Sequence, residues 1–323
     1  MSFYSRRCGK NSLFKWKDIK SLMNIVFVNQ SYKKALIVLC IAALGFAGNA
    51  IIGKLAVNEV SPIMIVFLRW GIVTCLLLLF RRKQFAAALP NIKNRFFWIL
   101  MMGGVGLTTF NSLFYIAAQY TSAINIGIMQ STMPALVVLG TVIFYKSKVL
   151  MAQYFGLLLT ILGVLVVVSK GQINTLFSLT GNIGDLIMLT GCMFYAGYNI
   201  GLRDRPPIDA LTMMTFFSIA AWIISCPLLA IEYSLDATLW PTTNGWLIIF
   251  YVALIPSLLS QVLFMHGVDL IGPGQAALHL NLVPIFTAIL GISILGEMLH
   301  VFHIASLLLV FLGIFAFRYT TKS

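Results

Sequence analysis

Two prolines 150 positions apart lie in matching surroundings, and this repeat constrains the fold more than any other feature of the sequence. Pro134 in MQSTMPALVVLG corresponds to Pro284 in HLNLVPIFTAIL. Further matches at the same offset are Leu113-Phe114 with Leu263-Phe264, Leu157-Leu158-Leu159 with Leu307-Leu308-Leu309, and Leu162-Gly163 with Leu312-Gly313. No gap is needed between residues 111 and 168. The sequence therefore predicts two copies of one unit, each broken by a proline.

The composition indicates that lipid is the solvent of this chain. It is 60% hydrophobic and 10% charged, whereas soluble globular proteins carry about 25% charged residues. The net charge of +13 comes from Lys and Arg residues that flank apolar runs. They do not form a separate basic domain, so we expect topology signals and lipid headgroup contacts, and no nucleic acid partner.

Apolar segments long enough to cross a bilayer recur along the whole chain. A hydrocarbon core of ~30 Å needs about 20 residues of helix. The expected segments are 35–55, 62–80, 96–118, 122–143, 150–169, 184–202, 210–231, 245–266, 273–295 and 302–319. The fold class is therefore predicted to be an all-α membrane protein with ten transmembrane helices and short loops.

The distribution of Lys and Arg predicts the orientation of these helices. With the N-terminus in the cytoplasm, 19 of the 22 basic residues lie on the cytoplasmic side. Only Lys54 and Lys170 lie outside, and Arg69 lies within a segment. Both termini are therefore expected in the cytoplasm, with the cell (inner) membrane as the location. Because each copy has five spans, the second copy must enter the membrane inverted.

The expected domains are an N-terminal arm (1–34), a first five-helix repeat (35–170) and a second one (181–319). The arm carries eight Lys and Arg residues, and apolar residues recur in it at helical spacing. Two interpretations are left open for it: a helix on the cytoplasmic membrane surface, or a disordered segment. No cleavable signal peptide is expected, because its only apolar stretch, 25–28, is too short.

Arg69 is the sharpest candidate for a functional residue. It lies eight residues into its segment, which places it ~11 Å deep at 1.5 Å per residue. A charge at that depth costs from ~3 to above 10 kcal/mol unless it faces water or a partner, and no acid lies at matching depth. Arg69 is interpreted either as a cavity residue that holds a carboxylate or phosphate, or as a structural residue that bonds to backbone carbonyls at the proline kinks or reaches outward to the membrane surface.

Pro134 and Pro284 each remove a helix hydrogen bond, and such breaks near the midplane indicate a binding site between the repeats. Polar side chains cluster around them, and a wet central cavity is the functional interpretation of the cluster. The alternative is a set of interhelical hydrogen bonds and packing kinks. The candidate substrate-binding residues are Arg69, Asn49, Asn111, Tyr115, Gln130, Tyr195, Tyr198, Asn199, Gln261, His279 and Asn281. His279 is either a proton relay or a neutral structural residue.

No catalytic or metal-binding pattern is recognisable. The chain lacks GxSxG, Walker and HExxH motifs, and its five cysteines are scattered without CxxC spacing. Neither a catalytic residue, a metal nor a cofactor is therefore expected. Without an ATP-binding motif, any transport is expected to depend on gradients, with a proton or an exchanged metabolite as the coupling partner.

The second proline segment ends in Gly296-Glu297, and the second span begins with Ser61-Pro62 followed by Leu68-Arg69. In these motifs the chain resembles the EamA-type members of the drug/metabolite transporter superfamily, over about residues 35–319. The resemblance implies a basket of helices around a central cavity, with alternating access and export. The first copy departs from the pattern, with Lys146-Ser147 where the second has Gly296-Glu297.

These observations together predict a secondary transporter of small polar metabolites, such as amino acids or related anionic or zwitterionic compounds. The expected partners are the metabolite and the lipid bilayer, and the protein is a monomer or a homodimer. Two alternatives from other classes were weighed. A receptor-like or structural membrane protein would need no polar cluster at the midplane. An intramembrane enzyme would need a nucleophile and a base at one depth, which the sequence does not offer.

Overall fold

The computed structural model describes residues 11–146, 151–172, 182–271, 276 and 279–319, and within this part it contains helices and no strand. The first repeat consists of α1 (Asn11–Leu55), α2 (Pro62–Ile92), η1 (Lys93–Arg95), α3 (Phe96–Ile99), η2 (Leu100–Thr108), α4 (Thr109–Tyr120), α5 (Ala123–Gln130), α6 (Met133–Tyr145) and α7 (Met151–Val168). The second consists of α9 (Ile183–Gly201), η3 (Leu202–Asp204), α10 (Ala210–Ser234), α11 (Thr243–Leu254), η4 (Ile255–Leu259), α12 (Ser260–Ile271), α14 (Leu282–Leu295) and α15 (Val301–Tyr319). The all-α fold predicted from the sequence is confirmed.

Several of these helices can cross a bilayer by length and composition. Five stretches in the described part qualify, namely 32–55, 62–120, 123–145, 210–234 and 243–271, and shorter apolar helices cover 154–168, 282–295 and 301–313. The stretch 62–120 is long enough for two crossings. The count of ten spans stays a prediction.

The two repeats are inverted relative to each other, as the packing of equivalent helices shows. Ser61, which precedes α2, meets Glu232 near the end of α10, while Arg81 in the second half of α2 meets Asp209 at the start of α10. The order of these contacts shows that α2 and α10 run antiparallel. They are the equivalent helices of the two repeats. The prediction of inverted repeats is confirmed at this pair.

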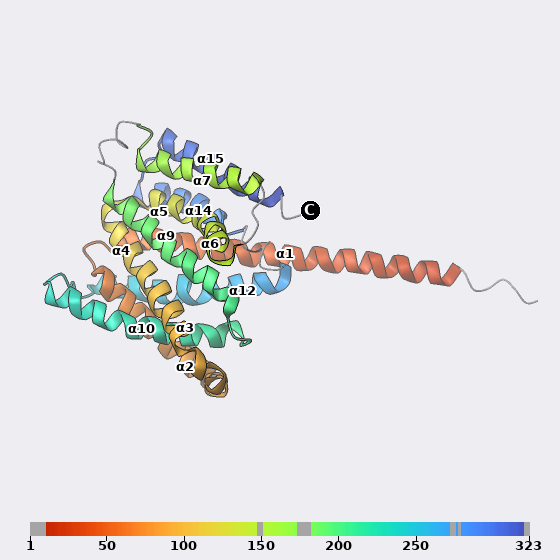
Figure 1. Cartoon of the computed structure of the whole chain (residues 1–323), viewed down its shortest axis with the longest axis horizontal. Helices are drawn as coiled ribbons and strands as arrows, with labels where there is room; N and C mark the ends of the chain where they lie inside the picture. The colour runs from red at the N-terminus through yellow and green to blue at the C-terminus, as the bar shows by residue number, and fades with distance from the viewer. Residues whose placement is uncertain (1–10, 147–150, 173–181, 272–275, 277–278, 320–323) are drawn as a thin grey trace, which may run out of the picture.

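The last helices of the repeats, α7 and α15, form a second antiparallel pair (Figure 1). The Ser306 hydroxyl donates to the carbonyl of Gly163 at 2.7 Å. Gly313, further along α15, lies against Gly156 and Thr160, which are earlier in α7. The order of contacts along the two helices is therefore reversed.

We name the two ends of the bundle by their charged residues. The basic end carries residues 81–95 and 203–205, and the opposite end carries residues 56–61 and 235–242. Residues 11–34 continue α1 as one helix, which projects past the basic end of the bundle (Figure 1). The arm thus has a helical backbone over its described part, and its relation to the membrane surface stays a prediction.

The third helix of each repeat is interrupted by a π-helix. These are η2 in the first repeat and η4 in the second. Pro256 in η4 lies 150 positions after Gly106 in η2, so the interruptions occupy equivalent places. A π-helix widens the turn and is frequently found at functional sites.

Two glycines give a direct test of the helix packing. A Cβ on Gly313 would lie 2.5 Å from the carbonyl oxygen of Gly156, a backbone atom that cannot move aside, while a Cβ on Gly197 would meet nothing within 4 Å. Alanine is favoured over glycine in a helix interior by about 1 kcal/mol. We expect Gly197→Ala to raise the melting temperature and Gly313→Ala to lower it by several degrees, as measured by thermal unfolding in detergent.

Candidate substrate cavity

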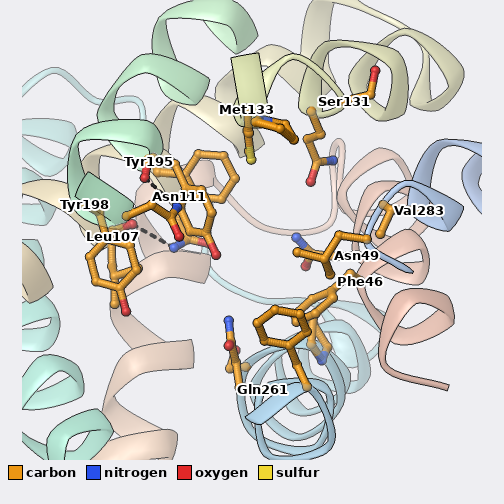
Figure 2. Close-up of a pocket in the computed structure, with 18 of the residues that line it drawn as sticks. Phe46, Asn49, Leu107, Asn111, Ser131, Met133, Tyr195, Tyr198, Gln261 and Val283 are labelled. Carbon is orange, nitrogen blue, oxygen red and sulfur yellow. Dashed lines mark hydrogen bonds between the residues drawn. The ribbon is translucent and has the colours of Figure 1, made fainter. Parts of the chain in front are cut away.

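A cavity of about 450 Å³ lies between the two repeats near the middle of the bundle (Figure 2). Its polar lining residues are Asn49, Arg69, Asn111, Gln130, Ser131, Tyr195, Tyr198, Asn199, Ser257, Gln261 and Asn281. Several come in pairs at the repeat offset, including Asn111 with Gln261 and Ser131 with Asn281. The internal repeat therefore places amide and hydroxyl groups on both walls.

Arg69 is held in this cavity by three hydrogen bonds. Its Nε donates to the Ser257 hydroxyl at 2.5 Å, and its Nη1 donates to Asn111 Oδ1 at 2.7 Å and to the Tyr115 hydroxyl at 2.9 Å. The Tyr115 hydroxyl in turn donates to Asn49 Oδ1 at 2.9 Å. Since the partners of Arg69 come from α4 and η4, the guanidinium is fixed in one orientation by both repeats.

The charge of Arg69 is not neutralised by a carboxylate within the described part of the chain. The one ion pair found there joins Arg81 and Asp209, and the hydrogen-bond partners of Arg69 are all neutral. Its Nη2 donates to no described residue, although the side chain is only 6% exposed. A buried cation is costly unless it is paired, so the cavity favours an anionic group beside Nη2.

The two proline breaks border the cavity, as their position in the sequence suggests. In the first repeat α5 ends at Gln130, and α6 begins at Met133, one residue before Pro134. The hydroxyls of Ser131 and Thr132 donate to the carbonyls of Ile128 and Met129. The broken backbone is thus partly satisfied from within the protein, as the membrane requires.

Gln130 leaves an unused hydrogen-bond donor at the first of these breaks. Its Nε2 is buried and has no hydrogen-bond partner among the described residues, while the residue lines the cavity. An unpaired buried amide costs about 1–3 kcal/mol. A ligand that accepts a hydrogen bond here would recover that free energy.

Aromatic rings form one wall of the cavity. The ring centroids of Phe110 and Tyr195 are 4.7 Å apart, and those of Tyr195 and Tyr198 are 5.5 Å apart. Phe46 and Trp70 add further apolar surface to the lining. The cavity therefore offers an apolar wall and a cationic, amide-rich wall to the same ligand.

Most of the candidates from the sequence meet at this cavity, although their roles in binding stay predictions. Those that line it are Arg69, Asn49, Asn111, Gln130, Tyr195, Tyr198, Asn199, Gln261, Asn281, Pro134 and Pro284. Tyr115 does not line the cavity, but its hydroxyl is hydrogen-bonded to two residues that do, Arg69 and Asn49. His279 is not among the lining residues. The sequence analysis missed Ser257, whose signal is its place after Pro256 in an apolar run.

The family of the chain follows from both repeats. The sequence model of the EamA-like transporter family matches residues 33–169 and, a second time, residues 182–319. The chain belongs to this family. The two matches cover the two inverted units, so the family assignment and the internal symmetry of the structure describe the same repeat.

Relatives of this EamA-like protein are named as transporters. It is 25% identical over 268 residues to the uncharacterized transporter YyaM of Bacillus subtilis (strain 168), covering 81% of this chain and 86% of the relative. It is 27% identical over 310 residues to the WAT1-related protein At2g39510 of Arabidopsis thaliana, covering 84% and 80%. A crystal structure of another protein matches with a TM-score of 0.61 at 14% identity, over 90% of this chain and 98% of the other, and supports the fold.

The opposite end of the bundle is closed by polar contacts, of which that of Glu297 joins the two repeats and that of Lys54 lies within the first repeat. The Glu297 carboxylate accepts hydrogen bonds from the backbone N–H groups of Ala123 and Ile124, at 2.7 and 2.9 Å, and so caps the N-terminus of α5. The Lys54 ammonium donates to the carbonyls of Ala118 and Thr121 at the end of α4. Each charge complements the helix end that it meets.

A second buried cluster at this end joins four helices. Asp185 in α9 is fully buried and accepts from the Thr121 hydroxyl at 2.5 Å and from Asn125 Nδ2 at 3.1 Å. His303 Nε2 lies 3.0 Å from Asn125 Oδ1, while its Nδ1 accepts from the N–H of His300. The ring proton is therefore on Nε2, which donates a hydrogen bond to Asn125 Oδ1. Access to the cavity from this end would require these contacts to separate.

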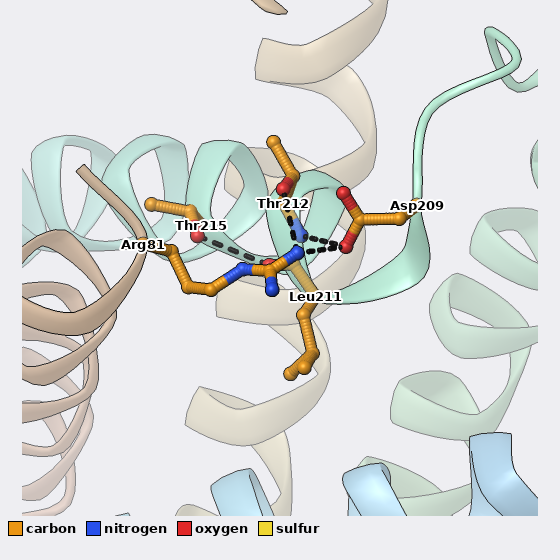
Figure 3. A network of polar contacts seen from close by, with 5 residues as sticks. All are labelled: Arg81, Asp209, Leu211, Thr212 and Thr215. Atoms are coloured by element: carbon orange, nitrogen blue, oxygen red, sulfur yellow. Dashed lines mark hydrogen bonds and ion pairs between the residues drawn. The ribbon is translucent and has the colours of Figure 1, made fainter. Parts of the chain in front are cut away.

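The basic end is held by a smaller and more exposed contact (Figure 3). Arg81 Nη2 lies 2.5 Å from Asp209 Oδ1, with the two side chains 26% and 51% exposed, and Asp209 also accepts from the N–H of Thr212 at the start of α10. Partial burial acts to raise the pKa of Asp209, but the hydrogen bonds from Thr212 and the Arg81 guanidinium outweigh it, so the pKa lies below its ordinary value. Exposed ion pairs contribute little to stability, so this contact holds the basic end only weakly.

Proposed function

We propose that this chain is a secondary transporter of small polar metabolites such as amino acids or related anionic or zwitterionic compounds. The observation that carries the proposal is Arg69, buried at the seam between the repeats with no carboxylate partner in the described part of the chain. A guanidinium donates charge-assisted hydrogen bonds to a carboxylate or phosphate, and the two N–H groups of Nη2 are the ones that Arg69 has left for them. The substrate would supply the missing negative charge.

The remainder of the lining supports a ligand that is polar at one end and apolar at the other. Gln130, Asn49 and Gln261 place amide groups around the cavity, and Phe110, Tyr195 and Tyr198 supply the aromatic wall. A volume of about 450 Å³ falls within the roughly 300–1,000 Å³ typical of small-molecule sites. We therefore propose a single small metabolite as the occupant.

The closed opposite end supports alternating access. Gln261 and Phe264, which line the cavity, lie on the side of the midplane toward the basic end, and the buried clusters of Asp185 and Glu297 close the other side. We propose that the basic end faces the cytoplasm, that the described conformation loads substrate from there, and that separation of the two clusters releases it outside. Export is the direction that this arrangement favours.

A proton or an exchanged metabolite would drive this movement. The family and the names of the relatives indicate a transporter and not an enzyme. A receptor-like protein with the same cavity would bind the metabolite without moving it across the membrane. A flux measurement separates these two functions, and binding alone does not.

A metabolite screen tests the proposed substrate class. Purified protein in detergent is heated with single compounds from a library of amino acids, organic acids, amines and neutral solutes. A ligand at 100 times its Kd stabilises the folded state by about 2.7 kcal/mol, so we expect compounds with a carboxylate or phosphate to raise the melting temperature by several degrees. Stabilisation by amines alone would contradict the proposal.

A further inference from the structure

A second hollow lies away from the substrate cavity, on the flank of the bundle at its basic end. This groove has a volume of about 750 Å³ and runs between the last turns of α2, the start of the third helix and α10. Its lining includes Phe85, Leu89, Phe96, Phe216 and Ile223. Lys93 is the one charged residue among the described residues that line it.

The groove exists because α2 changes direction at Arg81. The backbone of Arg81, with φ −119° and ψ 15°, interrupts the helical geometry, and the chain then continues helically to Ile92. Ala88 and Ile92 are buried in this second part, and the ring of Phe85 lies 4.5 Å from that of Phe216. The sequence analysis treated 81–95 as a loop, but its backbone is helical to Ile92.

The segment after the bend is amphipathic. Its apolar side packs on α10, whereas Arg82 and Lys83 are exposed. Leu89 and Phe96 are 48% and 62% exposed beside the groove. A helix with one apolar side and one basic side, placed at the end of a membrane span, is suited to the boundary between headgroups and acyl chains.

Three cations in this region are available to a ligand. Arg82, Lys83 and Lys93 make no hydrogen bond or ion pair with any residue in the described ranges, and the nearby Asp209 is already engaged by Arg81. Basic pockets between membrane helices at such an end bind anionic lipid headgroups. Lys93 lines the same groove as the apolar residues, so an acyl chain and a phosphate can be held by one continuous site.

We propose that this groove binds one anionic phospholipid, with an acyl chain between α2 and α10 and the phosphate at Lys93. A phospholipid fits better than a protein partner, because the groove combines exposed apolar residues, such as Leu89 and Phe96, with Lys93, and it lies beside a span where lipid is the solvent. A headgroup phosphate also satisfies the free ammonium of Lys93. The site is separate from the substrate cavity and does not depend on the proposed function.

Lipid binding to the purified full-length protein tests this site. Native mass spectrometry measures retention of phosphatidylglycerol and, separately, of phosphatidylcholine. We expect phosphatidylglycerol to bind at least about fivefold more tightly, and Lys93→Gln to remove most of that preference. Lys93→Arg should retain it. Lys83→Gln is the matched control, because it removes a charge from the same segment outside the groove.

Further outcomes would overturn the proposal. Equal loss from Lys93→Gln and Lys83→Gln would show diffuse attraction to the basic surface, and equal retention of the two lipids would show apolar contact alone. If glycerol phosphate displaced phosphatidylglycerol when both are present at the same concentration, the acyl chain would contribute nothing to the affinity. An unchanged melting temperature of Lys93→Gln in phosphatidylcholine is the control for folding.

Discussion

Replacing Arg69 by methionine, which has a similar length and no charge, should weaken binding of a carboxylate-bearing metabolite by at least about a hundredfold. Hydrogen bonds to charged groups contribute about 1.5–3 kcal/mol each, and Nη2 of Arg69 keeps two N–H groups that no described residue accepts. Two bonds at the lower value already correspond to a factor above one hundred. Isothermal titration with the strongest ligand from the metabolite screen measures this loss.

Two further variants, one at Arg69 and one at its partner Tyr115, separate the effect of the charge on affinity from the effect of the guanidinium orientation. Arg69→Lys keeps the cation, but an ammonium cannot reproduce the planar arrangement that reaches Ser257, Asn111 and Tyr115 and still face a ligand. We expect an intermediate loss of affinity. Tyr115→Phe removes one of the hydroxyls that orient Arg69 and should cost less, about fivefold, since the guanidinium and its other two hydrogen bonds remain and a typical hydrogen bond contributes about 1 kcal/mol.

The matched control for these variants is Arg81→Ala. Arg81 is also on α2 and also basic, but it lies at the basic end and pairs with Asp209 outside the cavity. Its loss should leave ligand affinity unchanged. If Arg69→Met binds the ligand as tightly as the unaltered protein while Arg81→Ala does not, the anion site has been placed wrongly.

The second large effect is expected at the closed end, where Glu297→Ala should loosen the first turn of α5. The Glu297 carboxylate accepts from the N–H groups of Ala123 and Ile124, and it comes from the other repeat. Loss of an N-terminal cap costs about 1–2 kcal/mol, which corresponds to about five- to thirtyfold faster local opening. Hydrogen exchange of a peptide covering 121–130 should therefore speed up by that factor.

A surface carboxylate at the same end provides the comparison. Asp236 is exposed in the turn after α10, and Asp236→Asn should leave the exchange of residues 121–130 unchanged. The contacts of Asp185 and Asn125 remain in both variants, so the protein is expected to stay folded. Unaltered exchange in Glu297→Ala would mean that this carboxylate does not hold the repeats together.

The two repeats differ at the residue that caps a helix at the closed end. Gly296 and Lys146, which are equivalent, both adopt a left-handed backbone, with φ of 65° and 50°. The next residue is Glu297 in the second repeat and Ser147 in the first, and Ser147 lies outside the described residues. Only the second repeat has a carboxylate at this position, so a cap of this kind is available to one end of the bundle alone.

The symmetric placement of residues around the cavity could be predicted from the sequence, because it follows from the constant offset between the two repeats. The offset of 150 residues pairs Asn111 with Gln261 and Pro134 with Pro284, and the inversion of the repeats puts equivalent positions at equal distances on opposite sides of the midplane. The depth of Arg69 follows in the same way from counting along its span. Periodicity and spacing carry this information without any knowledge of packing.

The partners of these residues could not be predicted in the same way. Ser257 reaches Arg69 from within a π-helix at Ile255–Leu259, and regular helical counting does not include the wider turn there. The contact of Asp185 with Asn125 and Thr121 depends on how α4, α5 and α9 meet. The sequence shows only polar residues near the ends of three apolar segments.

The most direct test of a carrier built from two inverted repeats is flux across a membrane. Purified protein is reconstituted in sealed liposomes, and entry of the radiolabelled metabolite that binds best in the screen is followed with and without the same compound inside. We predict saturable entry that Arg69→Met abolishes and Arg81→Ala retains. Tight binding of the metabolite to the reconstituted protein without any entry into the liposomes would contradict the account and favour a receptor.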